Sequence, residues 1–219
     1  MKPKFIILSI DGGAGTGKST TAHSLAESLN LLHVDTGSHY RAVTKALLDL
    51  GVSSAEAHEY LNKNELSLVT EVDGRRSCLV INQIMYDQTE LRSPEINEVV
   101  SDFSSQSCIR KLLFDYQRSQ VDFAKESKLS GVVMEGRDIG TVILPDADLK
   151  IFLEADSSIR ANRRMQDGES DQISNRDEKD TTRKISPLTP ADDCIHVDTG
   201  ILGVDEVKKL LLDVVGKLS

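Results

Sequence analysis

Nine consecutive residues near the start of the chain have the composition of a phosphate-binding loop. The run matches the pattern G-x-x-x-x-G-K-[ST] and continues with a threonine. Small residues let the backbone curl around phosphate groups, so that successive N–H groups face the phosphate oxygens. We therefore expect ATP to bind here, with Lys18 on the β- and γ-phosphates and the Ser19 hydroxyl on Mg²⁺. The residues of the loop are Gly12, Gly13, Ala14, Gly15, Thr16, Gly17, Lys18, Ser19 and Thr20.

The residues on both sides of this loop favour binding over a glycine-rich turn that binds nothing. An apolar run, residues 5–10, precedes the loop and suits a buried strand. Apolar residues at helical spacing, including Ala22 and Leu25, follow the loop. A loop between a strand and a helix places the positive end of the helix dipole at the phosphates. ATP binding is therefore the better explanation of the run.

Other charged residues could take part in phosphate chemistry, but each has an ordinary explanation as well. Glu135 follows the apolar residues 132–134, where it could either orient metal-bound water or form a salt bridge. Arg160 and Arg164 are four residues apart on an expected helix, so both side chains can point toward the ATP phosphates, with Arg163 beside them. A solvated basic helix face would produce the same spacing.

Five short apolar runs alternate with helical patterns along the chain. Each run suits a buried strand, and strands that alternate with helices form a parallel sheet covered on both faces. We therefore expect an α/β fold with three layers and a five-stranded parallel sheet. The runs are residues 5–10, 31–34, 132–134, 149–153 and 195–197.

Two segments depart from this alternation. In residues 57–102, Asp73-Gly74 marks a turn between two strand-like runs, 66–69 and 78–81, which predicts a small antiparallel insertion. We expect this insertion to bind the acceptor substrate and residues 1–56 and 103–219 to form the core. Residues 166–185 are polar and charge-dense, which suits a mobile lid better than a core element.

Composition excludes several classes of protein. The formal net charge of the 219 residues is −9, which argues against a broad nucleic-acid-binding face, because such faces need clustered lysine and arginine. No apolar run approaches the roughly 20 residues that span a bilayer. The three cysteines are widely spaced and odd in number, which argues against a disulfide framework. We expect a cytoplasmic monomer without nucleic-acid or membrane partners.

Three stretches resemble the signature sequences of bacterial cytidylate kinases. They are Asp35-Thr36-Gly37 with Tyr40-Arg41, the run Glu135–Thr141, and Asn175-Arg176-Asp177 with Asp180 and Arg183. The resemblance extends from the phosphate-binding loop to the final helix, and its most specific part is residues 136–141 with Pro145-Asp146-Ala147. Thr36 stands where many members of the family have serine, and the segment 166–175 is shorter than is usual in the family.

The resemblance implies an enzyme that moves the γ-phosphoryl group of ATP to CMP or dCMP with Mg²⁺. Arg41, Arg137 and Arg183 would face the acceptor phosphate, and Arg176 and Asp180 would lie near its phosphate and ribose. The catalytic residues would be Lys18, Arg137, Arg160, Arg164 and Arg183. The acceptor-binding residues would be Thr36, Tyr40, Arg41, Ser101, Arg110, Arg137, Asp138, Arg176, Asp180 and Arg183.

Recognition of the cytosine base is expected to depend on Asp138. A carboxylate can accept a hydrogen bond from the N4 amino group, while Arg110 and Ser101 can donate to the ring nitrogen and carbonyl. Uracil would turn a carbonyl toward Asp138, and a buried acid left unpaired can disfavour an analogue by up to about 10⁴-fold. We predict that CMP and dCMP are much better acceptors than UMP, unless Asp138 is only a structural partner of Arg137.

Several rival functions fit parts of the sequence. The loop alone would admit UMP/CMP, adenylate, shikimate or gluconate kinases. A regulatory GTPase is a weak alternative, because the nearest approach to its N-K-x-D motif, residues 62–65, ends in glutamate. Asp-Thr-Gly occurs twice, at 35–37 and 198–200, as in aspartic proteases, but those enzymes are almost entirely β. A nucleotide-binding regulator without turnover would need one nucleotide site, whereas the arginines imply two.

Overall fold

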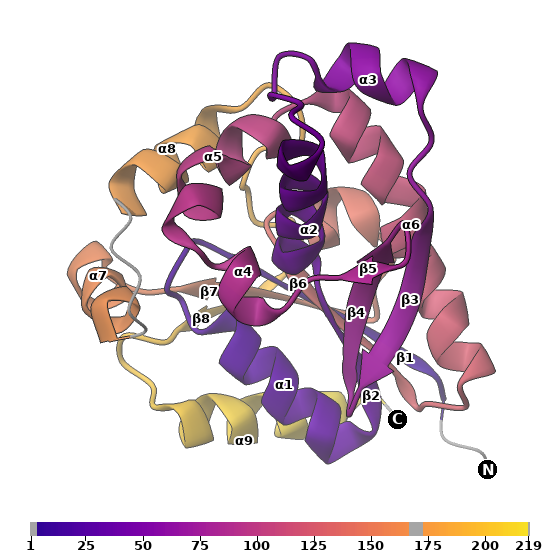
Figure 1. Ribbon diagram of the computed structural model, residues 1–219. Coiled ribbons are helices and arrows are strands. Elements are labelled where there is room, and N and C mark those ends of the chain that lie inside the picture. Colours follow the sequence, from indigo (N-terminus) through magenta and orange to yellow (C-terminus); the bar gives the residue numbers. More distant parts are fainter. Residues whose placement is uncertain (1–3, 167–172, 219) are drawn as a thin grey trace.

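A central sheet covered by helices on both faces organises the molecule (Figure 1). The computed structural model describes residues 4–166 and 173–218, without the side chains of residues 173–176. The three-layer α/β architecture expected from the sequence is confirmed. Within the described ranges, no helix combines the length and the apolar character needed to cross a bilayer.

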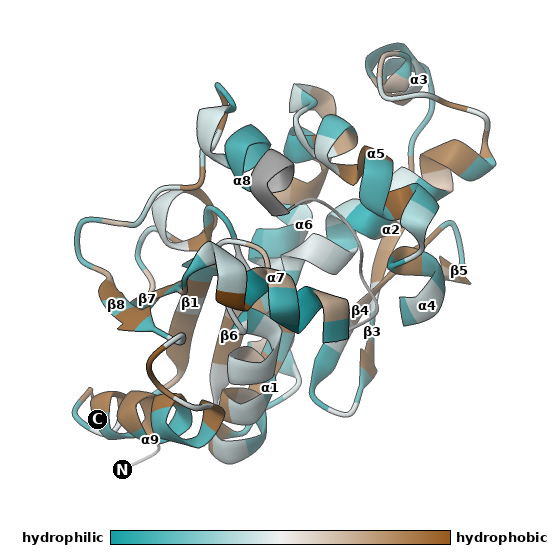
Figure 2. Cartoon of the chain, turned by 90° about the vertical axis from the view of Figure 1, so that its left-hand side faces the viewer, coloured by the Kyte–Doolittle hydropathy of each residue, from teal (hydrophilic) through white to brown (hydrophobic). Residues whose placement is uncertain are grey.

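The five apolar runs of the sequence form five neighbouring parallel strands, as predicted, in the order β2-β6-β1-β7-β8. Every residue of β2 and β6 is buried, which is typical of parallel strands with helices on both faces. Figure 2 shows brown, the hydrophobic end of its scale, on β1, β6, β7 and β8. The strands of the described residues are β1 (Ile6–Gly12), β2 (Leu31–Asp35), β3 (Leu68–Asp73), β4 (Arg76–Ile81), β5 (Ile84–Met85), β6 (Gly131–Gly136), β7 (Leu149–Glu154) and β8 (Ile195–Asp198).

The sheet is larger than the expected five strands, because the antiparallel segment of the insertion joins it. β3 and β4 pair antiparallel around the turn at Asp73-Gly74, as predicted, and β5 pairs with β4. β4 also pairs in parallel with β2, where His33 meets Arg76 and the His33 N–H donates to the Arg75 carbonyl at 2.7 Å. The eight described strands therefore form one continuous sheet.

Helices α1 and α9 cover one face of the sheet, where Leu25 and Leu211 pack with residues of β1, β7 and β8. α6 and the short π-helix η1 cover β2 and β6 on the other face. α2, α3 and α5 pack with α6 above the antiparallel strands. The described helices are α1 (Lys18–Leu29), α2 (Thr36–Asp49), α3 (Ala57–Lys63), α4 (Gln88–Leu91), α5 (Pro94–Ser104), α6 (Ser107–Glu126), η1 (Ile139–Ile143), α7 (Ser157–Gln166), α8 (Ile173–Thr182) and α9 (Val204–Val215).

The segment expected to be an irregular lid contains helix α8, which the sequence did not predict. The helix lacks an apolar stripe, so hydrophobic periodicity could not reveal it. Charged contacts hold the helix instead: Lys179 pairs with Asp102 of α5 at 2.7 Å, and Asp180 pairs with Arg137 at 2.8 Å. Part of the expected lid, residues 167–172, lies outside the described residues.

The carboxyl ends of the parallel strands meet at one edge of the sheet, and the candidate residues follow them. The phosphate-binding loop follows β1, Asp35 ends β2, and Arg137 and Asp138 follow β6. After β1 the chain continues to β2, which lies on one side of β1 in the sheet. After β6 it continues to β7, which lies on the opposite side of β1. Open parallel sheets bind ligands at such a reversal of strand order.

Candidate active site

A pocket of about 240 Å³ lies at this edge of the sheet. It brings together the phosphate-binding loop, the start of α2, part of α5, the segment after β6, and the region of α7 and α8. Residues far apart in the sequence therefore share one cavity. The pocket is lined by Ala14, Gly15, Gly17, Lys18, Ser19, Thr20, Asp35, Thr36, Gly37, Tyr40, Arg41, Arg92, Val100, Ser101, Ser104, Glu135, Gly136, Arg137, Asp138, Arg164, Asp180 and Arg183.

Two glycines of the loop adopt positions that other residues could not take without strain. Gly15 has φ +73°, and a Cβ there would lie 2.8 Å from the Arg160 carbonyl oxygen. Gly17 has φ +85° and forms the N-terminal cap of α1. These left-handed residues turn the loop sharply between β1 and α1, beside the positive N-terminal end of the helix dipole. The loop therefore has the local geometry of an anion-binding cradle.

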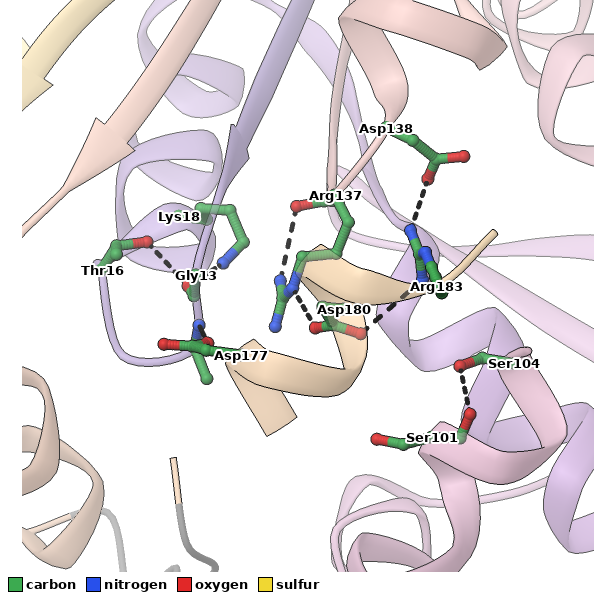
Figure 3. Close-up of polar contacts among 12 residues, drawn as sticks. Gly13, Thr16, Lys18, Ser101, Ser104, Arg137, Asp138, Asp177, Asp180 and Arg183 are labelled. Carbon is green, nitrogen blue, oxygen red and sulfur yellow. Dashed lines mark hydrogen bonds and ion pairs between the residues drawn. The ribbon is translucent and has the colours of Figure 1, made fainter. Parts of the chain in front are cut away.

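Lys18 is buried beside this loop. Its ammonium group donates to the Gly13 carbonyl at 2.7 Å, which Figure 3 shows. Burial, and then the nearby charge of Arg137, lowers the pKa of Lys18 to about 7, whereas Glu135, Asp11 and Asp35 oppose the shift. The negative charge of a phosphate beside the ammonium group would favour its protonated form again.

Ser19 and Glu135 form the side of the pocket that could hold a metal ion. The Ser19 hydroxyl donates to Glu135 Oε2 at 3.0 Å, and Glu135 Oε1 lies 2.8 Å from His33 Nε2. The sequence left open whether Glu135 faces a metal site or forms a salt bridge. In the structure Oε1 contacts His33, whereas Oε2 faces Ser19, so one carboxylate can take part in both. Mg²⁺ binds through one or two carboxylate or hydroxyl oxygens together with substrate phosphates, so this donor set fits Mg²⁺.

Five guanidinium groups line the same pocket. They come from α2, from the residue after α4, from the segment after β6, from α7 and from the segment after α8. The residues are Arg41, Arg92, Arg137, Arg164 and Arg183. Planar guanidinium groups bind phosphate oxygens bidentately, so the pocket suits polyanions despite the negative net charge of the chain.

A carboxylate and a backbone carbonyl hold three of these arginines in place. Arg137 Nε donates to Asp180 Oδ2 at 2.8 Å, and Arg183 Nη1 lies 3.6 Å from Asp180 Oδ1 (Figure 3). Arg41 donates to the Leu91 carbonyl at 2.9 Å. These contacts restrict the side-chain rotamers before any substrate arrives, which reduces the entropy lost on binding.

Asp138 lies at the far end of this arginine group. The carboxylate is buried and forms an ion pair with Arg110, and Arg183 Nη2 lies 3.7 Å from it. Arg110 in turn stacks over the Tyr40 ring, with 5.4 Å between the guanidinium carbon and the ring centroid. Arg110 does not line the pocket, whereas Asp138 and Ser101 do. The structure thus places Asp138 and Ser101 in the lining of the cavity, and Arg110 against Asp138 just outside that lining.

Asp11 fixes the segment that carries Arg137 and Asp138. The backbone N–H groups of Ile139 and Gly140 donate to its two carboxylate oxygens, each at 2.8 Å. Burial raises the pKa of Asp11 to about 6, against the effect of these two hydrogen bonds. The Thr36 hydroxyl, which was expected to bind the acceptor, donates to the Glu135 carbonyl at 2.7 Å and so holds the end of β6 just before this segment.

The three arginines of α7 take different positions. Arg164 is buried and lines the pocket. Arg160 lies outside the pocket lining, against the phosphate-binding loop, where it donates to the Ala14 carbonyl at 3.1 Å and pairs with Asp177. Asp177 also accepts from the Ala14 N–H at 3.3 Å. Arg163 donates to the Thr199 carbonyl at 2.7 Å.

The second Asp-Thr-Gly segment supports the phosphate-binding loop. Thr199 donates through its hydroxyl to the Thr16 carbonyl at 3.0 Å, and Asp198 accepts from the Gly200 N–H at 2.8 Å. Asp35 and Asp198 end strands that have three others between them, a separation of roughly 19 Å at the usual strand spacing. Such a separation excludes the paired aspartates of an aspartic protease.

Some expected residues lie elsewhere, and some pocket residues were not expected. Gly12, Gly13 and Thr16 belong to the loop but do not line the cavity, and the side chain of Arg176 lies outside the described residues. Sequence reasoning assigned no role to Arg92, whose Nη2 lies 3.7 Å from Asp35 Oδ2. It follows a four-residue helix with no periodic pattern, so no local signal marked it.

The loop between β1 and α1, the buried lysine and the arginine-lined pocket beside them define a kinase of the P-loop class. A sugar kinase from Janibacter sp. HTCC2649 shares the fold, with a TM-score of 0.51 and 12% sequence identity over 99% of both chains. Much nearer relatives exist in sequence. The chain is 39% identical to a cytidylate kinase of Carboxydothermus hydrogenoformans, over 96% of this chain and 97% of that protein.

The same name recurs among other relatives. The chain is 37% identical to a cytidylate kinase of Thermotoga neapolitana, over 95% of this chain and 96% of that protein. The sequence profile of the cytidylate kinase family matches residues 8–217. The chain belongs to the cytidylate kinase family.

Proposed function

We propose that this protein transfers the γ-phosphoryl group of ATP to CMP or dCMP, giving ADP and CDP or dCDP. The observation that carries the proposal is the single cavity that joins the phosphate-binding loop to five guanidinium groups. A protein that only sensed one nucleotide would have no use for so many phosphate-binding side chains in one place. The family membership of the chain supports the same conclusion.

The donor nucleotide would bind along residues 12–20. The amides of the loop and the dipole of α1 would hold the β-phosphate, with Lys18 on the β- and γ-phosphates. Arg164 would contact the transferred group from α7, and Arg160 would act from the outer side of the loop. Ser19 and Glu135 would hold Mg²⁺, Glu135 through water. When bound, Mg²⁺ neutralises the charge on the β- and γ-phosphate oxygens.

The acceptor would occupy the other end of the pocket. Arg41, Arg137 and Arg183 would bind its phosphate, and we add Arg92 to this group because it lines the same pocket. Asp180, and by family resemblance Arg176, would lie near the phosphate and ribose. Tyr40, Thr36 and Ser101 would line its channel, and Asp138 and Arg110 would bind the cytosine edge.

The chemistry needs alignment more than it needs a base. The attacking phosphate oxygen is already ionised at neutral pH, because the second pKa of a phosphate ester is about 6. The protein must therefore hold two polyanions in line and compensate the charge that spreads over the transferred group. Cationic side chains fixed by Asp180 and Asp138 can do so without reorganising during the reaction.

We propose that the antiparallel insertion, residues 57–102, and the lid, residues 166–185, close over both substrates. Closure would exclude water that otherwise hydrolyses ATP. A monomer in the cytoplasm, where both nucleotides are available, would fit this activity.

A coupled assay of ADP release tests the proposal against a regulator that binds without turnover. We expect rapid release with ATP, Mg²⁺ and CMP together, slow release without CMP, and CDP as the second product. ADP release that does not depend on CMP would reject the kinase proposal. Binding of both nucleotides without ADP release would favour the regulator.

A further inference from the structure

His33 lies behind the metal-binding side of the pocket without lining it. Its ring Nε2 is 2.8 Å from Glu135 Oε1, and the Ser19 hydroxyl donates to the other oxygen of the same carboxylate at 3.0 Å. The side chains of His33 and Glu135 are 6% and 3% exposed. A carboxylate accepts only, so Nε2 is the donor. The three side chains form a line from the sheet interior to the phosphate-binding loop.

We propose that His33 is a positioning residue: it fixes the Glu135 carboxylate so that Oε2 faces Ser19 and the metal that these two residues would hold. The inference rests on the proposed metal role of Ser19 and Glu135. It assigns the imidazole no contact with substrate or metal. Its contribution is the orientation of one carboxylate.

The backbone around His33 makes it a rigid support. In the sheet register His33 lies opposite Val133 and Asp35 opposite Glu135, so His33 and Glu135 point to the same face on adjacent strands. His33 also meets Arg76 of β4 on its other side, where its N–H donates to the Arg75 carbonyl at 2.7 Å. A strand paired on both edges cannot shift to accommodate a misplaced side chain.

The carboxylate needs this support because it is buried at the edge of a cavity. Without the imidazole, Oε1 would lose its buried donor, and the side chain could gain a new partner by turning toward the pocket. Turning would move Oε2 away from Ser19. Groups that orient metal-binding side chains in this way typically change metal affinity by about 10- to 100-fold when they are removed.

Two substitutions of the same polarity separate this role from simple packing. In His33→Gln, the amide nitrogen can take the place of Nε2 and donate to Glu135. In His33→Asn, the amide nitrogen takes the place of Nδ1 and cannot reach Glu135. Both variants exchange an imidazole for an amide on the same strand, so loss of the aromatic ring affects both.

The experiment measures binding in the full-length protein, without turnover. The affinity for a non-hydrolysable ATP analogue is titrated calorimetrically with Mg²⁺ and with a chelator, and the ratio of the two affinities is the metal enhancement. We expect about a tenfold smaller enhancement in His33→Asn, an enhancement near that of the wild type in His33→Gln, and equal affinities with the chelator in all three proteins.

A third variant, Ser19→Ala, tests the proposed metal role of Ser19 separately from the positioning role of His33. We expect this variant to lose the enhancement. Suppose that Ser19→Ala does lose the enhancement. The positioning role of His33 is then overturned if His33→Asn keeps the wild-type enhancement, or if the enhancement in His33→Gln falls as far as it does in His33→Asn. The proposed metal site stands in either case. If Ser19→Ala keeps the wild-type enhancement, the proposed metal role of Ser19 fails, and the inference fails with it.

Discussion

Several buried charges in the pocket occur as ion pairs, and these pairs limit the contacts that each residue can make with a substrate. Arg137 is held by Asp180, and Asp138 is held by Arg110 and Arg183. The sequence identified these residues through short motifs but could not determine their partners. It left Asp138 as either a base-binding group or a partner of Arg137, whereas its ion pairs are with arginines of α6 and of the segment after α8. Pairing depends on tertiary contacts that residue spacing does not encode.

Asp138→Asn should weaken the preference for CMP over UMP. The carboxylate can only accept hydrogen bonds, so it pairs with an amino group and repels a carbonyl, whereas an amide can turn its NH₂ group toward either base. We expect kcat/KM for CMP to fall by up to about 10²-fold, which corresponds to one buried polar group left without its partner, and the CMP-to-UMP ratio to fall as well. Steady-state kinetics with both acceptors measures this. Asp146→Asn, at an exposed position of the following segment, is the control, and an unchanged ratio in Asp138→Asn would refute base recognition by Asp138.

Lys18→Met should abolish most turnover without unfolding the protein. We expect kcat to fall by at least about 10²-fold, because one cationic donor to the transferred phosphate is lost. Burial disfavours the charged ammonium group, as its lowered pKa of about 7 indicates, so the apolar side chain should leave the melting temperature unchanged or raise it. Single-turnover kinetics and thermal melting check the two parts. A stable variant with wild-type kcat would show that Lys18 is not catalytic.

At the scale of elements, the segment after β6 depends on a carboxylate that is costly to ionise. Asp11 accepts two backbone N–H groups of this segment, yet burial raises its pKa from 3.8 to about 6. The native state therefore binds more protons than the unfolded state between these pH values, and this group lowers stability as pH rises through them. The shift corresponds to about 3 kcal/mol.

Comparison with Asp11→Asn isolates this effect. We expect the free energy of unfolding of the wild type, relative to the variant, to be largest near pH 4 and to fall by up to about 3 kcal/mol by pH 6.5. Urea unfolding across this range measures the difference. A difference that stays constant or grows with pH would contradict the assignment of the raised pKa to Asp11.

Helix α8 is held mainly by charged contacts, and Asp177 provides one that reaches the phosphate-binding loop. Its carboxylate pairs with Arg160 and accepts from the Ala14 N–H. We expect Asp177→Asn to loosen α8, so that the amides of the helix exchange faster with solvent in hydrogen-exchange measurements. Glu178→Gln, an exposed neighbour on the same helix, should leave exchange unchanged. Equal exchange in both variants would show that Asp177 does not anchor α8.

The sequence predicted the elements unequally. The five parallel strands were predictable because each is a short apolar run between turn signals, as in residues 149–153. The antiparallel pair was also predictable, but its union with the main sheet depends on one parallel contact between His33 and Arg76, which no periodicity shows. Hydrophobic periodicity could not predict helix α8 either, because its contacts are ionic and its surface is largely hydrophilic (Figure 2).

At the scale of the whole molecule, an acidic protein concentrates its cations in one cavity. The chain carries a net charge of −9, yet five arginines and Lys18 line a pocket at the carboxyl edge of the sheet. Helices and connecting segments from distant parts of the chain supply these groups, so the fold itself brings distant positions together. The phosphate-binding loop was evident from sequence alone. The convergence of the arginines, and the presence of Arg92 among them, required the tertiary structure.

The most direct test of the central claim is a panel of acceptors at equal concentration with Mg²⁺-ATP. Initial rates of ADP release are measured for CMP, dCMP, UMP and AMP, with the diphosphate products identified by mass spectrometry. The account predicts fast formation of CDP and dCDP and rates at least about 10²-fold lower with UMP and AMP. Equal rates for CMP and UMP, or a higher rate with AMP, would contradict it.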